Sequence, residues 1–306
     1  MESKFVLLEQ LCRIPGTSGD ESLVSDFLLE YVQSMSGRWQ QKPEIWAGDG
    51  FQDTVTLIFG KPSVAIYAHL DTVGYMVRYD NYLVPIGGTA GETGDILVGM
   101  HQGKLLETVL VSEDHSDLID SREILEPGTR LTYMPRFKQE GDYLKSPYLD
   151  DRLGVWALLQ LAPTIKNAAL VFTTYEEISG GMAGFLARQL FEKFQVSKAI
   201  IADVTWVSEG VKPGSGPVFS IRDSRIPRKA FVDQLRKRAM EAKIPFQLEV
   251  ESQGGSDGRE IQHLPYPIDW VFIGPPSENP HSALETVHIH DVEAFVDLLS
   301  LLAGES

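Results

Sequence analysis

Short apolar runs alternate with longer amphipathic runs over most of the chain, and this alternation restricts the fold more than any other feature. The short runs are mostly apolar and contain β-branched residues, as buried parallel strands do; they lie at 62–69, 168–174, 198–204, 245–250 and 269–274. The longer runs have helical periodicity; they lie at 18–35, 152–161, 182–194, 229–243 and 291–303. We therefore predict an α/β fold, with a mostly parallel sheet and helices on both faces.

The helix predicted at 18–35 has a start signal. Ser18 and Glu21 have the spacing of a capping box, in which each side chain binds the backbone of the other residue. Apolar side chains then recur on one face as far as Met35. We therefore expect the helix to begin at this pair.

Residues 76–146 differ from the rest of the chain. They are rich in Gly, Pro and Asp, contain short alternating runs such as "YLVPIG" and "TRLTYMP", and have no clear amphipathic helix. We predict a small all-β domain inserted into the α/β domain, which then comprises residues 1–75 and 147–306. Two or three long loops are the alternative, but structureless loops of that length are uncommon.

Composition excludes several classes of partner. The formal net charge of −16 disfavours nucleic acid and anionic membranes, because few cations are available to replace counterions. No window of about 18 apolar residues could span a membrane, and the first residues lack the basic and apolar regions of a signal peptide. Cys12 is the single cysteine, so an internal disulfide is excluded. We expect a cytoplasmic protein with no nucleic-acid partner and no membrane partner.

Polar residues collect where predicted strands end, and ligands of open α/β sheets bind beyond the carboxyl ends of strands. The residues at such positions, or just before the helix at 152–161, are His69, Asp71, Asp150, Glu176, Glu177, Asp203 and His281. Each has a structural explanation when taken singly, since a lone histidine is usually structural and an Asp is a good helix cap. Together, their imidazoles and carboxylates suit zinc and related divalent ions. The set is large enough for two cations and a bridging carboxylate.

The adjacent glutamates Glu176 and Glu177 need an explanation of their own. Two like charges at the end of a buried strand repel each other, and burial makes each charge more costly. A cation offsets this cost if one carboxylate binds it and the other acts on a metal-bound water. Gly180 and Gly181, which follow, would let the chain bend so that both side chains face a cleft.

In this order, the motifs resemble those of the dinuclear-metal aminopeptidases. This family includes glutamyl aminopeptidase and the TET-type deblocking aminopeptidases, which are co-catalytic zinc peptidases of clan MH. The motifs are "AHLDTVGYMV", "LDDRLG", "YEEISGG", "ADV", "GGSDG" and "PHSALETV", and the resemblance extends from "RIPGTSGDES" to "HSALETV". It implies an α/β fold of the zinc-exopeptidase type.

Spacing separates this family from a related one. His69 and Asp150 are 81 residues apart, and the predicted β-insertion lies between them. This insertion is similar to the PDZ-like domain of the TET-type enzymes, which contributes to their oligomer contacts. In the related dimeric carboxypeptidases and deacylases, the extra domain falls in the later interval, which here separates Asp203 from His281. The resemblance therefore implies a homo-oligomer in which residues 76–146 serve assembly or substrate access.

The resemblance also implies a role for each motif residue. His69 and Asp203 would bind one metal, Glu177 and His281 would bind the other, and Asp150 would bridge them. Asp71 would orient His69, as hydrogen-bonded carboxylates do at metal sites, and Glu176 would be the general base and acid. The peptide bond between Asp150 and Asp151 would be cis. Asp257, in "GGSDG", is a candidate substrate contact, with a turn role as its alternative.

The implied activity is that of a metal-dependent aminopeptidase, which hydrolyses N-terminal residues from peptides. A metal-bridging water would lose its proton to Glu176, attack the peptide carbonyl, and leave Glu176 to pass the proton to the leaving amine. The implied cofactors are two divalent metal ions per chain, with zinc as the first choice and cobalt or manganese as alternatives. The implied partners are peptide substrates and further copies of the chain.

Two alternatives belong to other classes of function. One is a dinuclear-metal deacylase or other amidohydrolase, acting on N-acyl amino acids or small amides. The other is an inactive scaffold, which a missing ligand would have supported, but no motif residue is missing. A glycosidase would leave both histidines and Asp203 unused. Arg222, Arg225 and Arg259 could approach a substrate and favour an acidic N-terminal residue, but we prefer a surface role for them.

Overall fold

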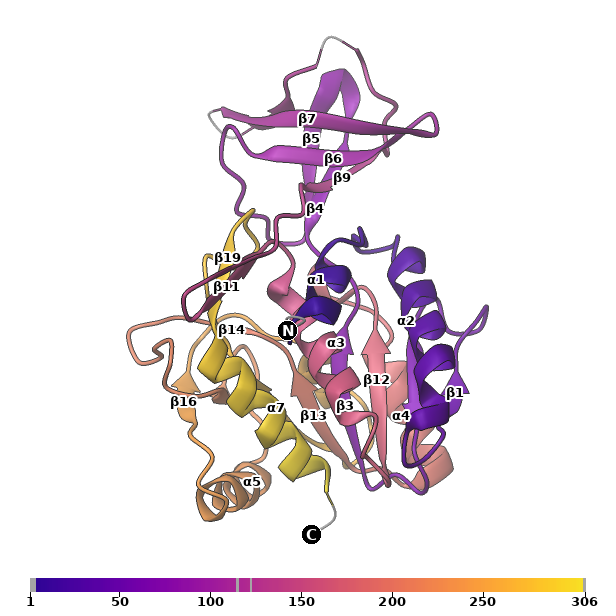
Figure 1. Ribbon diagram of the computed structural model, residues 1–306, viewed down its shortest axis with the longest axis vertical. Helices are drawn as coiled ribbons and strands as arrows, with labels where there is room; N and C mark the ends of the chain where they lie inside the picture. Colours follow the sequence, from indigo (N-terminus) through magenta and orange to yellow (C-terminus); the bar gives the residue numbers. More distant parts are fainter. Residues whose placement is uncertain (1–3, 114–115, 122, 305–306) are drawn as a thin grey trace.

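An eight-stranded sheet forms the centre of the larger domain (Figure 1). The structure is a computed structural model, and it describes residues 4–113, 116–121 and 123–304. In order across the sheet, the strands are β1 (Glu44–Trp46), β2 (Val55–Ile58), β12 (Ala168–Thr173), β3 (Val64–His69), β13 (Lys198–Ala202), β17 (Asp269–Gly274), β15 (Val218–Arg222) and β16 (Gln247–Val250). The central strands β12, β3, β13 and β17 are parallel, whereas β2 and β15 run antiparallel to their inner neighbours. The predicted α/β fold is confirmed, with antiparallel pairs toward both edges of the sheet.

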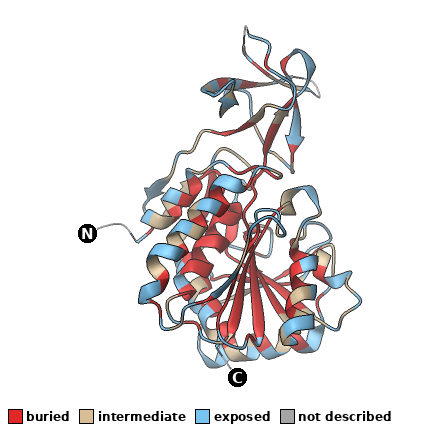
Figure 2. Ribbon diagram, turned by 90° about the vertical axis from the view of Figure 1, so that its right-hand side faces the viewer, coloured by how far each residue is buried: buried red, intermediate tan, exposed pale blue. Residues whose placement is uncertain are grey.

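Helices cover both faces of this sheet. One face carries α1 (Val6–Cys12), α2 (Ser22–Met35), α3 (Leu149–Leu161), α5 (Lys229–Glu241) and α7 (Ile289–Ala303), and the other carries α4 (Ala183–Phe194) and α6 (Gly258–Gln262). Strand residues alternate between the two cores, so Ile66 packs with the first set of helices and Tyr67 with the second. Figure 2 shows the buried strands between exposed helix faces. No helix among the described residues is both long and apolar enough to cross a membrane.

α2 begins at Ser22 and not at the predicted Ser18, and the prediction of a capping box is wrong. No side chain caps this helix. Ser18 Oγ instead donates to Asp71 Oδ2 at 2.7 Å. Glu21 Oε1 accepts from the backbone N–H groups of Gly19, at 2.9 Å, and of Tyr175, at 3.3 Å. The two side chains therefore bind other groups instead of forming the helix-capping hydrogen bonds that the local pattern predicts.

The inserted region forms a closed β-barrel, which stands apart from the sheet in Figure 1. Its strands follow the order β4 (Gly74–Val77), β5 (Tyr82–Ile86), β8 (Ser116–Ile119), β7 (Lys104–Glu113), β6 (Ile96–His101) and β9 (Arg130–Tyr133). Leu97, Leu110 and Leu131 contribute to a core of its own. The barrel agrees with the predicted all-β insertion, whereas its likeness to a PDZ domain and the boundaries at 76 and 146 stay predictions.

A second, five-stranded sheet lies between the barrel and the first sheet. Its order is β10 (Lys138–Glu140), β11 (Tyr143–Ser146), β19 (Glu285–His288), β18 (Pro276–Glu278) and β14 (Thr205–Trp206). Three short 3-10 turns complete the described elements: η1 (Ser36–Arg38), η2 (Tyr79–Asn81) and η3 (Glu176–Ile178). The pairing of β11 with β19 places Ser146 opposite Glu285, so the segment that enters α3 lies beside the one that follows His281.

Candidate metal centre

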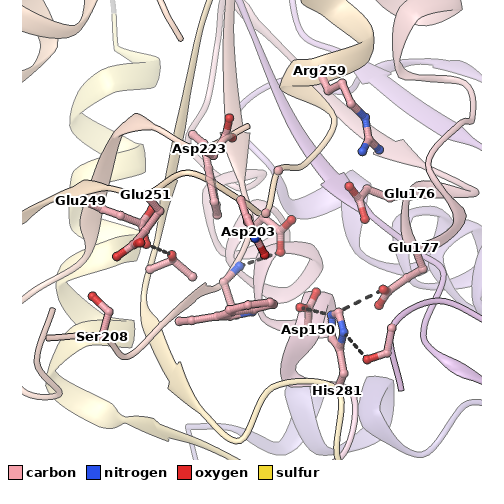
Figure 3. A pocket seen from close by; sticks show the side chains of 18 of the residues that line it. Asp150, Glu176, Glu177, Asp203, Ser208, Asp223, Glu249, Glu251, Arg259 and His281 are labelled. Carbon is pink, nitrogen blue, oxygen red and sulfur yellow. Dashed lines mark hydrogen bonds and ion pairs between the residues drawn. The ribbon is translucent and has the colours of Figure 1, made fainter. Parts of the chain in front are cut away.

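Three neighbouring parallel strands end at one place. β3 ends at His69, β13 ends just before Asp203, and the segment after β12 turns into η3 at Glu176. Because β12, β3 and β13 are adjacent and parallel, the residues that follow them meet at one edge of the sheet. Asp150 comes from the first turn of α3, and His281 comes from the loop between β18 and β19 (Figure 3). The structure therefore gathers residues that are far apart in the sequence.

Asp150 lies between the two histidines. His69 Nε2 is 3.0 Å from Asp150 Oδ1, and His281 Nε2 is 3.2 Å from Asp150 Oδ2. Each histidine also lies near a second carboxylate. Asp203 Oδ2 is 3.7 Å from His69 Nε2, and Glu177 Oε2 is 3.5 Å from His281 Nε2. The five predicted ligands thus form two halves that share Asp150.

The donor atoms of this cluster fit a metal ion. His69, Asp150 and Glu177 offer ligand atoms within 4.8 Å of one another, and so do His69, Asp151 and Asp203. Glu177 Oε1 is buried and has no hydrogen-bond partner among the described residues. A buried carboxylate oxygen without a partner costs free energy, and a cation at this position would remove that cost.

The charges of the cluster also favour a bound cation. Burial raises the pKa of Glu177 to about 8, and Asp150 adds to the effect. Burial likewise raises the pKa of Glu176 well above its ordinary value. Burial alone would lower the pKa of His69, but the surrounding carboxylates, Asp203 first among them, raise it instead. The group is therefore too rich in carboxylates to be fully ionised by itself, and a divalent cation would supply the missing positive charge.

Asp71 holds the turn that carries the adjacent glutamates. Its Oδ1 accepts from the N–H of Glu176 at 3.0 Å, and its Oδ2 accepts from the N–H of Glu177 at 3.1 Å. His69 Nδ1 lies 3.0 Å from the backbone carbonyl of Asp71 and 3.5 Å from its carboxylate Oδ1. The nearer partner of His69 is thus the carbonyl, while the carboxylate fixes the turn.

The backbone of this turn requires a glycine at one position. Gly181 has a φ of +99°, and a Cβ there would lie 2.0 Å from the carbonyl oxygen of Thr174. A Cβ at Gly180, by contrast, would point into open space. Tyr175 and Ser179, on either side of η3, have φ values of 65° and 61°, which ordinary residues rarely adopt. Of the two glycines expected to allow the bend, Gly181 is therefore the one that sterics demand.

Glu285 supports two predicted ligands, and no sequence motif indicated this role. The residue is buried. Its Oε2 accepts from the N–H of Asp150 at 2.9 Å, and its Oε1 accepts from the N–H of His281 at 3.1 Å. One carboxylate therefore ties together the segments of Asp150 and His281, which are 131 residues apart in the chain. Its position four residues after His281, in "HSALE", is the only available signal.

The "GGSDG" motif also supports the cluster. Ser256 Oγ donates to Asp203 Oδ2 at 2.6 Å, so this serine orients a predicted ligand. Asp257 is buried and accepts from Thr173 Oγ1 at 2.5 Å. Burial raises the pKa of Asp257 to about 7. Its role as a substrate contact stays a prediction, since the one described hydrogen bond of its side chain joins it to the end of β12.

Asp151 supports the cluster from inside the domain. Its Oδ2 accepts from the N–H of His69 at 3.2 Å, and its Oδ1 accepts from the N–H of Gly154 at 2.8 Å. The peptide bond between Asp150 and Asp151 is cis, as the family resemblance implies. The adjacent aspartates therefore have different tasks, with Asp150 facing both histidines and Asp151 holding the backbone of one.

A cavity of about 530 Å³ opens over the cluster (Figure 3). Its lining includes Asp150, Glu176, Glu177, Asp203 and His281, followed by Trp206, Asp223, Glu249, Glu251 and Phe272. Arg259 also lines it, so the surface role predicted for this arginine is wrong. Arg222, in contrast, is exposed, as expected. A volume of this order fits a small ligand or the end of a peptide.

Glu21 offers a test of the fold beside the site. Burial raises its pKa to about 7, from an ordinary 4.5. Because the pKa is higher in the folded state, folding takes up a proton, and this contribution to stability is lost as the pH rises from about 4.5 to 7. Glu21→Gln keeps an acceptor oxygen for the two N–H groups but does not titrate. In metal-free protein, we therefore expect the Tm of Glu21→Gln minus that of wild type to be larger at pH 8 than at pH 5.

Thermal unfolding in EDTA at both pH values measures this difference. Glu30→Gln, an exposed position on α2, is the matched control and should show no such change. A Tm difference for Glu21→Gln that stays constant between the two pH values would contradict the expectation.

Comparisons with known proteins identify relatives of this chain. The family model for the M42 glutamyl aminopeptidase matches residues 101–298. A relative from Acetivibrio thermocellus, assigned by name to the aminopeptidases, is 26% identical over 333 residues, covering 97% of this chain and 98% of the relative. A relative from Escherichia coli with a similar name is 25% identical over 346 residues, covering 97% of this chain and 93% of the relative.

Solved structures share the fold. The aminopeptidase from the archaeon Desulfurococcus kamchatkensis has a TM-score of 0.85 and 22% identity, covering 98% of this chain and 94% of that chain. The TET1 peptidase of Pyrococcus horikoshii has a TM-score of 0.82 and 22% identity, covering 99% of this chain and 100% of that chain. Since the family model spans more than half of the sequence, the chain belongs to the M42 glutamyl aminopeptidase family and is an aminopeptidase, a hydrolase of peptide bonds.

Proposed function

We propose that this aminopeptidase works with two divalent cations held by the cluster. His69 and Asp203 would hold one cation, Glu177 and His281 the other, and Asp150 would bind both. The observation that carries the proposal is the position of Asp150, whose two carboxylate oxygens lie 3.0 Å and 3.2 Å from different histidines. Zinc is the first choice because its protein ligands include imidazole and carboxylate, with cobalt or manganese as alternatives.

When bound, the cations would supply Lewis acidity to the substrate carbonyl and lower the pKa of a water between them. Glu176 would act as general base and then as general acid, moving a proton to the leaving amine. Its side chain lines the cavity, and the hydrogen bond from its N–H to Asp71 fixes the turn beneath it. Burial raises the pKa of Glu176, which makes its carboxylate a stronger base than an exposed one.

The acidic cluster also accounts for a preference for a free N-terminus. A free α-amine is attracted to the carboxylates around the site, whereas an acylated nitrogen carries no charge and is bulkier. Peptides that enter the cavity amine first would therefore place their first peptide bond beside Glu176. We infer that the substrates are peptides with an unblocked N-terminal residue.

We infer further that the chain forms a homo-oligomer. The TET1 peptidase of Pyrococcus horikoshii can assemble into a tetrahedron or a large octahedral shell. In this chain the barrel leaves Met100, Leu105 and Val84 exposed, and contact with another subunit would cover such apolar side chains. We propose that a PDZ-like domain at 76–146 serves assembly or substrate access, and that residues 1–75 and 147–306 form the catalytic domain. We propose also that the enzyme is cytoplasmic. Light scattering should give a mass that is a multiple of 34.0 kDa.

Metal content and cleavage, measured on one sample, test the proposed function. After reconstitution with zinc, we expect about two metal ions per chain by mass spectrometry. Aminoacyl-anilides with a free amine should be cleaved, their N-acetylated counterparts should not, and EDTA should abolish cleavage. Preference for the N-acetylated substrates would favour a deacylase instead. Absence of stoichiometric metal from an active enzyme would contradict the dinuclear site.

Glu285→Gln should weaken metal binding. The amide retains one acceptor oxygen and loses the other, so the N–H of either Asp150 or His281 loses its partner. Loss of such supporting contacts typically costs about 10–100-fold in metal affinity, and competition with a chelating dye would measure it. Glu278→Gln, at an exposed position on β18, is the control. Equal zinc affinity in Glu285→Gln and wild type would show that these contacts do not position the ligands.

A further inference from the structure

One end of the cavity is acidic and lies away from the adjacent glutamates. Asp223 follows β15, Glu249 belongs to β16, and Glu251 follows β16. All three line the cavity, and in Figure 3 they lie on the opposite side of Asp203 from Glu176 and Glu177. They are not part of the metal cluster, and the proposed reaction gives them no task.

These three carboxylates form no ion pair with a described residue. Asp223 and Glu249 are only 5% and 6% exposed. No Lys, Arg or His in the described part of the chain forms an ion pair with any of the three within 4.0 Å. Burial raises the pKa of Glu249, and Glu251 and Asp223 act in the same direction. The three carboxyl groups therefore disfavour one another's ionisation, and a cationic ligand would offset this repulsion.

A serine hydroxyl lies at the same end of the cavity. Ser220 on β15 stands in register with Glu249 on β16 and with Phe272 on β17. Residues opposite each other on neighbouring strands point to the same face of a sheet, so Ser220 lies between two side chains that line the cavity. It is 3% exposed, and its hydroxyl interacts with Glu249, whose pKa it lowers. The serine therefore favours the charged form of a carboxyl group that lines the cavity.

We propose that this acidic end binds the side chain of the substrate's N-terminal residue and selects a basic one, lysine or arginine. The inference rests on the proposed function, because it places the first peptide bond of the substrate at the cluster beside Asp203. Thr205, two residues after Asp203, donates from Oγ1 to Glu249 Oε1 at 2.5 Å, which fixes this carboxylate close to the cluster. Trp206, which is 50% exposed, and Phe272 would cover the apolar stem of the side chain.

Arg259 is the one residue in the cavity that argues for an acidic side chain. In Figure 3 its guanidinium points toward Glu176, away from Glu249 and Glu251. Its Nε lies 3.2 Å from Glu260 Oε1, so a carboxylate already faces it. Burial raises the pKa of Asp223 even though Arg225 and Arg259 lower it. The two arginines therefore do not outweigh burial at Asp223, and a glutamyl side chain entering this end would add a further acidic group.

Three substrates that differ only in the first residue test the inference. The zinc-reconstituted full-length enzyme would be assayed for kcat/KM on the p-nitroanilides of lysine, norleucine and glutamate. Norleucine has the apolar stem of lysine without the ammonium group. We expect lysine to exceed norleucine by about 10–100-fold, the range typical of a hydrogen-bonded charged group, and glutamate to be the poorest of the three.

Variants at the acidic end of the cavity distinguish a role in substrate binding from a purely structural role. Glu249→Gln and Glu251→Gln should each lower the ratio of lysine to norleucine by about 10-fold. Glu251→Lys should move the preference toward glutamate, and Glu251 is exposed, so this change leaves the fold intact. Glu107→Gln, at an exposed position on the barrel, is the matched control and should leave the ratio unchanged.

The outcomes are distinguishable. Cleavage of norleucine or glutamate substrates at least as fast as lysine substrates would overturn the inference and leave the proposed function standing. An equal loss on all three substrates in the glutamine variants would also overturn it, because the carboxylates would then have only a structural role. Absence of cleavage of every substrate by the zinc-loaded enzyme would overturn the proposed function, and the inference with it.

Discussion

Replacing Glu176 by glutamine should lower kcat by about 10²–10⁴-fold, the range that general acid–base catalysis contributes, without loss of bound metal. Glutamine has nearly the same shape as glutamate, but it does not take up a proton from water at neutral pH. The hydrogen bond from the N–H of residue 176 to Asp71 involves the backbone, so the turn should survive the change. KM should change little, since the proton is moved in the transition state. An anilide assay and metal analysis on the same sample would measure both quantities.

The same substitution at the next residue is the matched control. Glu177 Oε2 lies 3.5 Å from His281 Nε2, and its Oε1 is the buried oxygen without a described partner. Because Glu177 is a proposed metal ligand, the Glu177→Gln variant should lose metal together with activity. The two variants therefore distinguish a general base from a metal ligand at adjacent positions. If Glu176→Gln also lost metal in proportion to activity, Glu176 would be a ligand and the proton transfer would need another residue.

The central strands could be predicted because burial on both faces leaves a continuous apolar run in the sequence. The run at 269–274, for example, coincides with β17. The short strands of the second sheet have no such run. β14 has two residues, and it is a strand only because Thr205 and Trp206 pair with the segment at 276–277. Closure of the barrel is likewise a property of strand pairing, which the local sequence does not record.

The predicted ligands share a chemistry that the sequence displays, whereas their supporting residues do not. Imidazoles and carboxylates at strand ends are recognisable by type and position. Glu285 and Ser256 act through contacts to segments 135 and 53 residues away, so no local pattern reveals them. Glu21 is the sharper case, because its local pattern indicates a helix cap while its carboxylate accepts from the backbone of Tyr175.

Asp150→Ala should remove most of the metal from both positions and lower kcat by more than about 10³-fold. A single substitution affects both ions because the two oxygens of Asp150 face different histidines. A bridging carboxylate is shared by the two metals of a dinuclear centre, so each would lose a ligand at once. Metal analysis after dialysis against a fixed free zinc concentration would measure the loss. Unfolding in EDTA would establish that the variant is folded.

Asp203→Asn provides the comparison that identifies a bridge. Asp203 Oδ2 lies 3.7 Å from His69 Nε2, and Asp203 is proposed to bind only the ion held by that histidine. We therefore expect Asp203→Asn to lose about one metal per chain and to retain the other, held by Glu177 and His281. Loss of a single ion in Asp150→Ala would make Asp150 an ordinary terminal ligand. Only a larger loss in Asp150→Ala than in Asp203→Asn is consistent with one carboxylate that joins the two halves of the cluster.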